Sequence, residues 1–235
     1  MYKRQLPLSD EEEKIYVANL AKVNEELQQL YDIEGSDKMQ ILKMLTRLRQ
    51  LCLEPRLVYD NIDQPSSKLK ACMELIKTMQ ENKQKVLLFS SFTSALDLIA
   101  EECQKAGITY YMLTGSTNKE ERRELVSRFQ KDDTTLFLIS LKAGGTGLNL
   151  TSAENVIHYD PWWNVSAQNQ ATDRAYRIGQ KSNVQVFNLV MKDSVEEKII
   201  EMQKRKKELA DMFVENNSGG LSQMSKEDIL SLFTM

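Results

Sequence analysis

Residues 85–93 read Lys-Val-Leu-Leu-Phe-Ser-Ser-Phe-Thr, an apolar run that ends in small hydroxyl side chains just before a helical pattern. The same alternation continues along the chain, with strands expected at 86–89, 108–113, 136–139, 156–159 and 184–190 and helices at about 94–106, 118–131 and 166–178. Short apolar runs that alternate with helices are typical of βαβ units. The sequence therefore predicts an α/β fold with a parallel sheet flanked by helices.

Helical patterns precede this region. Ser9 and Glu12 form a capping box that opens an amphipathic helix through about Tyr31, and residues 35–37 break it. A second helix ends at Pro55. A third begins near Ser67, after a linker-like stretch.

A long helix is also expected after the last strand. It begins at Ser194, with Glu197 three residues on, and a joint at 216–220 separates it from a short helix over 225–233. The helix expected at 118–131 should open with a capping box of Thr117 and Glu120. The predicted domains are a helical subdomain and linker over 1–66, an α/β lobe over 67–193 and closing helices over 194–235.

Composition excludes several classes of protein. No run of about 18 uncharged apolar residues occurs, and no apolar signal core follows Met1, so membrane spans and secretion are not expected. The three cysteines and one histidine cannot form a disulfide framework or a zinc site, which favours a reducing compartment. The net charge of −3 lacks the basic excess of an autonomous DNA-binding domain, so any contact with nucleic acid is expected to be local.

Small hydroxyl residues and glycines follow three predicted strands, at 90–93, 114–117 and 140–147. Such loops leave backbone N–H groups available for phosphates, and together they suit a phosphate backbone. Any one of them alone is more often an ordinary capped loop, and it is their convergence that favours phosphate binding. The glycine-rich segment 144–147 fails the dinucleotide-binding pattern because Leu150 stands where its third glycine belongs.

The apparatus of a complete nucleoside triphosphatase is missing from the chain. No Gly-Lys-[Ser/Thr] phosphate cradle occurs, since residues 179–182 lack the Gly-Lys junction. The run that ends in Asp160 resembles a metal-binding strand, but Pro161 follows where a glutamate would position water. His158, within that strand, is interpreted as structural rather than catalytic.

Residues 170–180 read Gln-Ala-Thr-Asp-Arg-Ala-Tyr-Arg-Ile-Gly-Gln. On one helix, Gln170, Arg174 and Arg177 would share a face beside an alanine-rich packing stripe. Two guanidinium groups held a turn apart suit the stabilisation of a triphosphate in its transition state, the arginine-finger role. The alternative is a surface helix on which Asp173 pairs with Arg177.

Five segments in this order closely resemble the C-terminal helicase lobe of Swi/Snf-type DNA-dependent ATPases, which belong to helicase superfamily two. They are residues 85–92, 113–116, 143–151, 160–164 (Asp-Pro-Trp-Trp-Asn) and 170–180. Residues 45–52 with Pro55 look like the family's helical insertion, and 195–200 like its closing helix. Leu141-Lys142 and Val165 depart from the common Thr-Arg and proline and are more typical of bacterial or archaeal members.

The resemblance implies a two-lobed RecA-like motor that binds ATP with Mg²⁺ between its lobes and steps along double-stranded DNA. The phosphate cradle and the metal-binding acids belong to an N-terminal RecA-like lobe, the implied partner, so this chain supplies no metal ligand. Arg174 and Arg177 would be catalytic, and the nucleotide-side residues would be Gly145, Gly147, Gln170 and Asp173. The implied DNA-side residues are Ser91, Thr114, Gly115, Lys142, Asn149, Thr151, Trp163 and Asn164.

From this resemblance we expect the C-terminal half of an ATP-driven DNA translocase or remodelling motor, which is inactive as an ATPase without its other lobe. A DNA-bound protein is a further possible partner, and the expected location is the cytoplasm of a bacterium or archaeon, or the nucleus of a eukaryote. Two alternatives stay open. One is a non-catalytic module that binds DNA or a partner protein, and the other is a small-molecule transferase. Trp162 and Trp163 suit hinge packing as well as a coupling role.

Overall fold

The computed structural model describes residues 2–31, 38–144, 148–175, 183–212 and 232–233. The chain divides into two compact units. Met1–Arg4 and Leu69–Val190 form the first, which we call the lobe, and Gln5–Lys68 and Met191–Met235 form the second, the helical unit. Most of the two segments that were expected separately, 1–66 and 194–235, thus falls in one unit, whereas Met1–Arg4 belongs to the lobe.

The lobe is built on a six-stranded sheet in the order β1-β6-β5-β2-β4-β3. Its strands are β1 (Tyr2–Leu6), β2 (Val86–Ser90), β3 (Tyr110–Leu113), β4 (Leu136–Ser140), β5 (Asn155–His158) and β6 (Gln185–Met191). The pairs β2–β4, β2–β5, β3–β4 and β5–β6 are all parallel. Every residue of β2, β4 and β5 is buried, as expected for strands covered on both faces. The predicted parallel α/β sheet is confirmed.

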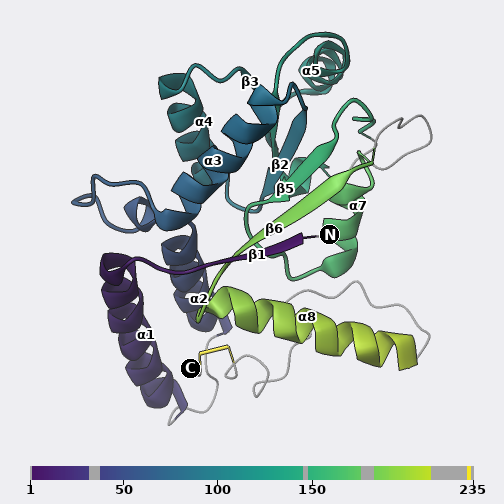
Figure 1. The fold of residues 1–235 in the computed structure, drawn as a ribbon. Helices are drawn as coiled ribbons and strands as arrows, with labels where there is room; N and C mark the ends of the chain where they lie inside the picture. Colours follow the sequence, from purple (N-terminus) through teal and green to yellow (C-terminus); the bar gives the residue numbers. More distant parts are fainter. Residues whose placement is uncertain (1, 32–37, 145–147, 176–182, 213–231, 234–235) are drawn as a thin grey trace. The chain divides into compact units, whose positions relative to one another are not determined.

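Helices cover both faces of this sheet. They are α3 (Ser67–Glu81), α4 (Thr93–Lys105), α5 (Lys119–Lys131), α6 (Leu141–Gly144) and α7 (Val165–Thr172). Phe89 and Phe137 share one buried cluster with Phe129 of α5 and Ala171 of α7. Because successive strand residues point to opposite faces, α5 and α7 pack on one face of the sheet. Figure 1 shows α4 on the other side of the strands from α7.

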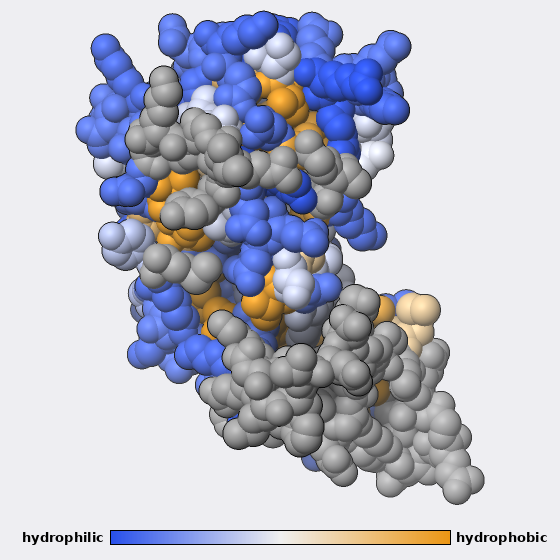
Figure 2. Space-filling model, turned by 90° about the vertical axis from the view of Figure 1, so that its right-hand side faces the viewer, coloured by the Kyte–Doolittle hydropathy of each residue, from blue (hydrophilic) through white to orange (hydrophobic). Residues whose placement is uncertain are grey.

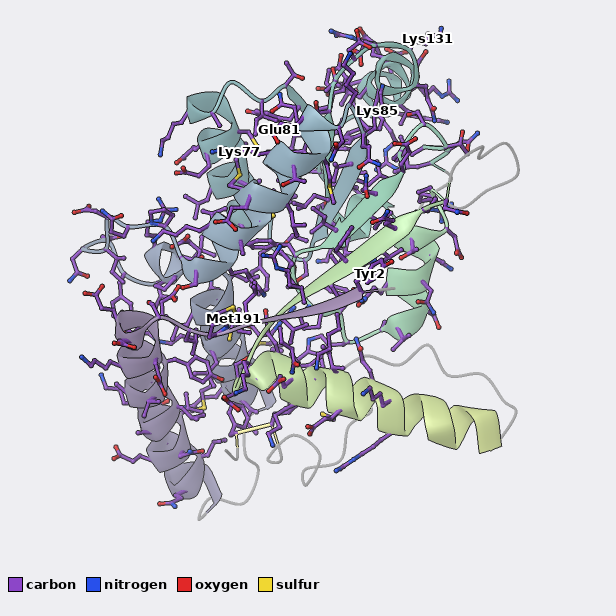
Figure 3. All side chains as sticks on the ribbon, viewed as in Figure 1. Tyr2, Lys77, Glu81, Lys85, Lys131 and Met191 are labelled. Carbon is purple, nitrogen blue, oxygen red and sulfur yellow. The ribbon has the colours of Figure 1, made fainter. Side chains whose placement is uncertain are left out.

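Lys85 fixes the direction of α5 relative to the sheet. It stands directly before β2, and Figure 3 labels it together with Lys131, where α5 ends. Its Nζ donates hydrogen bonds to the main-chain oxygens of Phe129 and Asp132 and lies 4.7 Å from the centroid of the Phe129 ring. The last turn of α5 is thus tied to the amino edge of the sheet, and its first turn lies toward the carboxyl edge.

The helical unit contains α1 (Asp10–Tyr31), α2 (Lys38–Leu53), a 3₁₀ turn at Pro55–Leu57 and α8 (Val195–Met212). The predicted capping box is present: the N–H of Ser9 donates to Glu12 Oε2 over 2.7 Å. The face of α2 predicted to be apolar is buried, including Leu45 and Leu48. Glu12 also accepts hydrogen bonds from Ser67, so it caps α1 and the start of α3 together.

The structure differs from the sequence-based expectations at β1, at the start of α5 and at the end of α7. The first strand, β1, was not predicted, because its five residues include two cations and lack an apolar run; Tyr2 stacks on Phe187 of β6 at 5.5 Å. The cap of α5 is Asn118, whose side chain accepts from the N–H groups of Glu120 and Glu121, whereas Thr117 accepts from the N–H of Thr114. Helix α7 ends at Thr172 and not at 178.

Several expectations lie outside the described residues. The break at 35–37, the joint at 216–220 and most of the terminal helix over 225–233 are among them. In the helical unit, Leu232 and Phe233 are described and both are buried.

Candidate functional site

The carboxyl ends of four parallel strands meet at one edge of the lobe. Ser90 is in register with Ser140, Leu113 with Ile139, and Phe89 with His158. The loops that begin at Ser91, Thr114 and Leu141 therefore follow neighbouring strands at the same edge, which we call the carboxyl edge. In open parallel sheets, this edge is where ligands bind. The structure thus brings together the starts of the three loops that the sequence singled out.

Ser91 is engaged with another loop at this edge. Its N–H donates to Asp160 Oδ1 over 3.0 Å, and its hydroxyl donates to Asp160 Oδ2. Asp160, two residues past β5, also accepts from the hydroxyl of Ser90 over 2.7 Å. The predicted DNA-side hydroxyl of Ser91 is therefore held by a buried protein carboxylate, a role that Asp160 did not have in the sequence interpretation.

The loop after β3 has polar groups with room around them. The Oγ1 of Thr114 and the Oγ of Ser116 share a hydrogen bond of 2.8 Å, and Thr114 is partly exposed. Gly115 is exposed, and a Cβ built on it would meet nothing within 4 Å. Packing within the lobe therefore does not require glycine at this position.

The segment after β4 forms the one-turn helix α6 where a loop was expected. Lys142 is exposed on it, so its ammonium group is accessible from the solvent. Asn149 is also exposed, and its main-chain oxygen accepts a hydrogen bond of 2.7 Å from Gln130 Nε2. Thr151 is partly buried. Gly145 and Gly147 lie outside the described residues.

A basic pocket of about 740 Å³ lies between the first turns of α5 and the segment around Asn149. Its cations are Lys119, Arg122 and Arg123, and Leu148 and Val126 form part of its apolar lining. These cations were missed from the sequence, although their spacing of three and four residues places them on one helical face and would have identified the cluster. Three cations around a concave surface suit an anionic ligand.

Helix α7 carries the segment before the predicted arginines. Asn164 is its N-cap, and its side chain accepts from the N–H of Ala167 over 3.1 Å. Trp162 packs against the core cluster, and its main-chain N–H donates to Gln168 Oε1 over 3.2 Å. Trp163 is partly exposed. Asn164 and Trp162 thus have structural roles in starting the helix.

The predicted single face with Gln170, Arg174 and Arg177 is wrong for the first two residues. Gln170 is exposed on α7, whereas Arg174 lies in the turn after the helix and is 7% exposed. The main-chain oxygen of Arg174 accepts from the N–H of Leu150 over 3.0 Å. Asp173 is exposed and ends α7, and Arg177 lies outside the described residues.

The sequence interpretation proposed a structural role for His158, and the structure buries this residue. Its Nε2 lies 2.9 Å from Thr172 Oγ1, and its ring stacks on Phe89 with centroids 5.7 Å apart. Burial lowers the pKa of His158 to about 4, against the smaller opposing effect of Asp160. The imidazole is therefore uncharged at neutral pH and serves as a hydrogen-bonding group.

Within the described ranges, no cluster of three or more His, Cys, Asp or Glu side chains is arranged to hold a metal ion. The oxygen ligands that Mg²⁺ prefers are thus not gathered in this part of the chain.

The surface around α7 combines polar and apolar groups. Figure 2 views the side on which Figure 1 draws α7 and shows hydrophobic patches within a mainly hydrophilic surface. Within the described part of the chain, no helix is both long and apolar enough to span a bilayer.

Comparisons with known proteins show which family domain and which proteins this chain resembles. Residues 67–179 match the helicase conserved C-terminal domain. The chain is 36% identical over 208 residues to an uncharacterized ATP-dependent helicase of Mycoplasma pneumoniae, which covers 88% of this chain and 20% of that protein. It is 36% identical over 240 residues to the putative ATP-dependent helicase/translocase YwqA of Bacillus subtilis, covering 99% and 26%. The chain spans about a fifth to a quarter of the length of these relatives.

Solved structures also match nearly the whole chain. The C-terminal domain of the SWI2/SNF2 ATPase of Sulfolobus solfataricus superposes with a TM-score of 0.77 at 25% identity, covering 98% of this chain and 96% of that one. The core of the same ATPase in complex with double-stranded DNA gives a TM-score of 0.78 at 29% identity, covering 98% and 49%. By sequence and by its RecA-like fold, the chain belongs to the C-terminal helicase lobes of the Swi2/Snf2 family of ATP-dependent helicases.

Proposed function

We propose that this chain is the second half of an ATP-dependent double-stranded DNA translocase, which works together with an N-terminal RecA-like lobe. The observation that carries the proposal is that the loops after β2, β3 and β4 begin at the same edge of a parallel sheet. The first turns of α5, which carry the cations of the basic pocket, lie toward this edge as well. A solved relative of the same fold binds double-stranded DNA. The activity of the whole protein is part of the proposal.

The DNA strand would lie along the carboxyl edge. Lys142 and the cations of the basic pocket would meet phosphates, and Thr114, Gly115, Asn149 and Thr151 would line the path. A lysine meets a phosphate as a point charge, so Lys142 would supply charge without the two-pronged geometry of an arginine. Ser91, Trp163 and Asn164 would shape this edge from within the lobe.

ATP would bind on the side of α7, between this lobe and its partner. Arg174 and Arg177 would stabilise the charge that develops on the γ-phosphate, with Gln170, Asp173, Gly145 and Gly147 toward the nucleotide. Mg²⁺ would be held by carboxylates of the N-terminal lobe. A remodelled DNA-bound protein is a further partner, in the cytoplasm of a prokaryote or the nucleus of a eukaryote.

Binding of a short DNA duplex to this chain at several salt concentrations tests whether DNA binds at the carboxyl edge. We expect weak binding, because the net charge of −3 opposes it, and Lys142→Ala and Arg122→Ala should each weaken it further. Each substitution should also reduce the slope of log affinity against log salt by about one phosphate contact. The readout is fluorescence anisotropy of a labelled duplex.

The matched control is Lys105→Ala. Lys105 is exposed at the end of α4, and because that helix returns from the end of β2, it lies at the amino edge of the sheet. Equal losses for Lys105→Ala and Lys142→Ala would contradict a local DNA edge. Tight, salt-sensitive binding by the chain without any ATPase activity when it is joined to its partner lobe would favour the non-catalytic binding module.

A further inference from the structure

Asp160 joins the ends of two neighbouring strands. Its carboxylate is 1% exposed and accepts hydrogen bonds from both Ser90 and Ser91. Ser90 Oγ in turn accepts from the N–H of Phe92, the N-cap residue of α4. One charged group thus fixes three consecutive residues at the carboxyl edge. Charge-assisted hydrogen bonds of this kind are about twice as strong as neutral ones.

His158, two residues before Asp160, contacts the end of α7 through Thr172. Thr172, the last residue of α7, donates its hydroxyl hydrogen to the main-chain oxygen of Gln168 over 3.2 Å. The same hydroxyl oxygen lies 2.9 Å from His158 Nε2, so Thr172 connects the imidazole to the end of α7. Stacking of His158 on Phe89 ties the same residue to β2.

The turn that follows Thr172 is held from a second direction. Leu150, next to the DNA-side residue Asn149, donates its N–H to the oxygen of Arg174. The N–H of Arg174 itself donates to the oxygen of Ala171 over 3.2 Å. Asp160 thus contacts the loop of Ser91, and His158, two residues earlier in the same strand end, contacts Thr172, two residues before Arg174.

We propose that Asp160 and His158 are positioning residues that link the DNA-side loop after β2 to the arginine turn after α7. This inference rests on the proposed function and adds to it a route by which occupancy of the DNA edge changes the placement of Arg174. Neither residue touches the reacting atoms. A shift of the Ser91 loop moves Asp160, and with it the strand end that fixes Thr172.

Amide hydrogen exchange in this chain tests the link without relying on activity. Asp160→Asn should accelerate exchange of the Asp173, Arg174 and Ala175 amides by about tenfold, the effect of one lost charge-assisted hydrogen bond. Thr172→Val, which keeps the side-chain shape, should do the same from the other end. Unchanged exchange at 173–175 in Asp160→Asn would overturn the proposal, as would equal acceleration at all amides of the lobe.

The matched control is Ser140→Ala. Ser140 ends β4 in register with Ser90 and is similarly buried, but its Oγ has no hydrogen-bond partner among the described residues. It should leave exchange at 173–175 unchanged, and acceleration there in this control would count against a route through Asp160.

A second arm uses the chain joined to its N-terminal lobe. The ratio of DNA-stimulated to basal ATP turnover should fall about tenfold in Asp160→Asn and Thr172→Val and stay constant in Ser140→Ala. A proportional fall of both rates would show a structural role and overturn the proposal. If the unaltered joined protein shows no stimulation by DNA, the proposed function fails, and the exchange experiment decides the link by itself.

Discussion

Replacing Arg177 with Ala in the chain joined to its N-terminal lobe is expected to lower kcat for ATP hydrolysis by about 10³-fold. The physical reason is the charge that develops on the γ-phosphate, which a guanidinium stabilises more in the transition state than in the bound substrate. The same loss is expected for Arg174→Ala. Steady-state hydrolysis at saturating ATP and DNA measures both, and KM for ATP should change far less than kcat.

Burial of Arg174 requires a control for folding. Because its side chain is 7% exposed within the lobe, Arg174→Ala removes packed atoms as well as a charge. Arg174→Lys keeps the charge but loses the planar fork, so it should preserve the thermal midpoint better than the alanine variant while kcat stays low. Full activity of both Arg174→Ala and Arg177→Ala would reassign the two residues to structure.

Glu196→Ala is expected to lower the free energy of unfolding of this chain by about 3–5 kcal/mol. In the helical unit, Glu196 Oε1 lies 2.6 Å from Lys68 Nζ, with side-chain exposures of 1% and 0%. Removing the carboxylate leaves the ammonium group buried without its ion-pair partner. Glu196 Oε2 also accepts from the N–H of Met191 over 2.8 Å, a bond that alanine removes as well.

The position of this ion pair in the chain explains its importance. Lys68 is the last residue of the helical unit before the chain enters the lobe, and Met191 is the first after it returns. The carboxylate of Glu196 therefore contacts both Lys68 and Met191. The neighbouring residues are held in the same way, since the N–H of Ser66 donates to Glu54 Oε2 and the N–H of Ser67 to Glu12 Oε1.

Urea unfolding of single and double variants separates the ion pair from its surroundings. Lys68→Met combined with Glu196→Gln removes both charges and keeps an acceptor for Met191, so it should recover most of the loss seen in either single variant. The exposed pair of Lys105 and Glu102 is the control, and Lys105→Met should cost less than about 1 kcal/mol. Additive losses in the double variant would contradict a strongly coupled buried pair.

The elements of the lobe could be predicted from sequence where a pattern is local. The run at 86–89 has no polar residue to interrupt it, and the periodicity of Leu96, Ile99 and Cys103 marks the buried face of α4. The strand β1 gives no such signal, because its exposed residues acquire their strand conformation from pairing with β6.

The end of α7 depends on contacts that sequence spacing does not reveal. The pattern continues through Ala175, yet the hydroxyl of Thr172 contacts His158 and the oxygen of Arg174 accepts from Leu150. These tertiary hydrogen bonds form where the helical pattern would continue.

For the candidate site as well, local patterns could be predicted from sequence and tertiary contacts could not. The convergence of three loops follows from parallel strands and could be predicted, whereas the bond between Ser91 and Asp160 joins residues 69 positions apart. The basic pocket was open to prediction, since Lys119, Arg122 and Arg123 are close in sequence. Their proximity to Asn149 required the structure.

The central claim is that this chain completes an ATPase site that it cannot form alone. The most direct measurement is DNA-stimulated ATP hydrolysis by the purified chain, by its N-terminal lobe, and by the two joined. We expect no turnover above background from either part, and turnover that rises with double-stranded DNA from the joined protein. DNA-stimulated hydrolysis by this chain alone, or none by the joined protein, would contradict the claim.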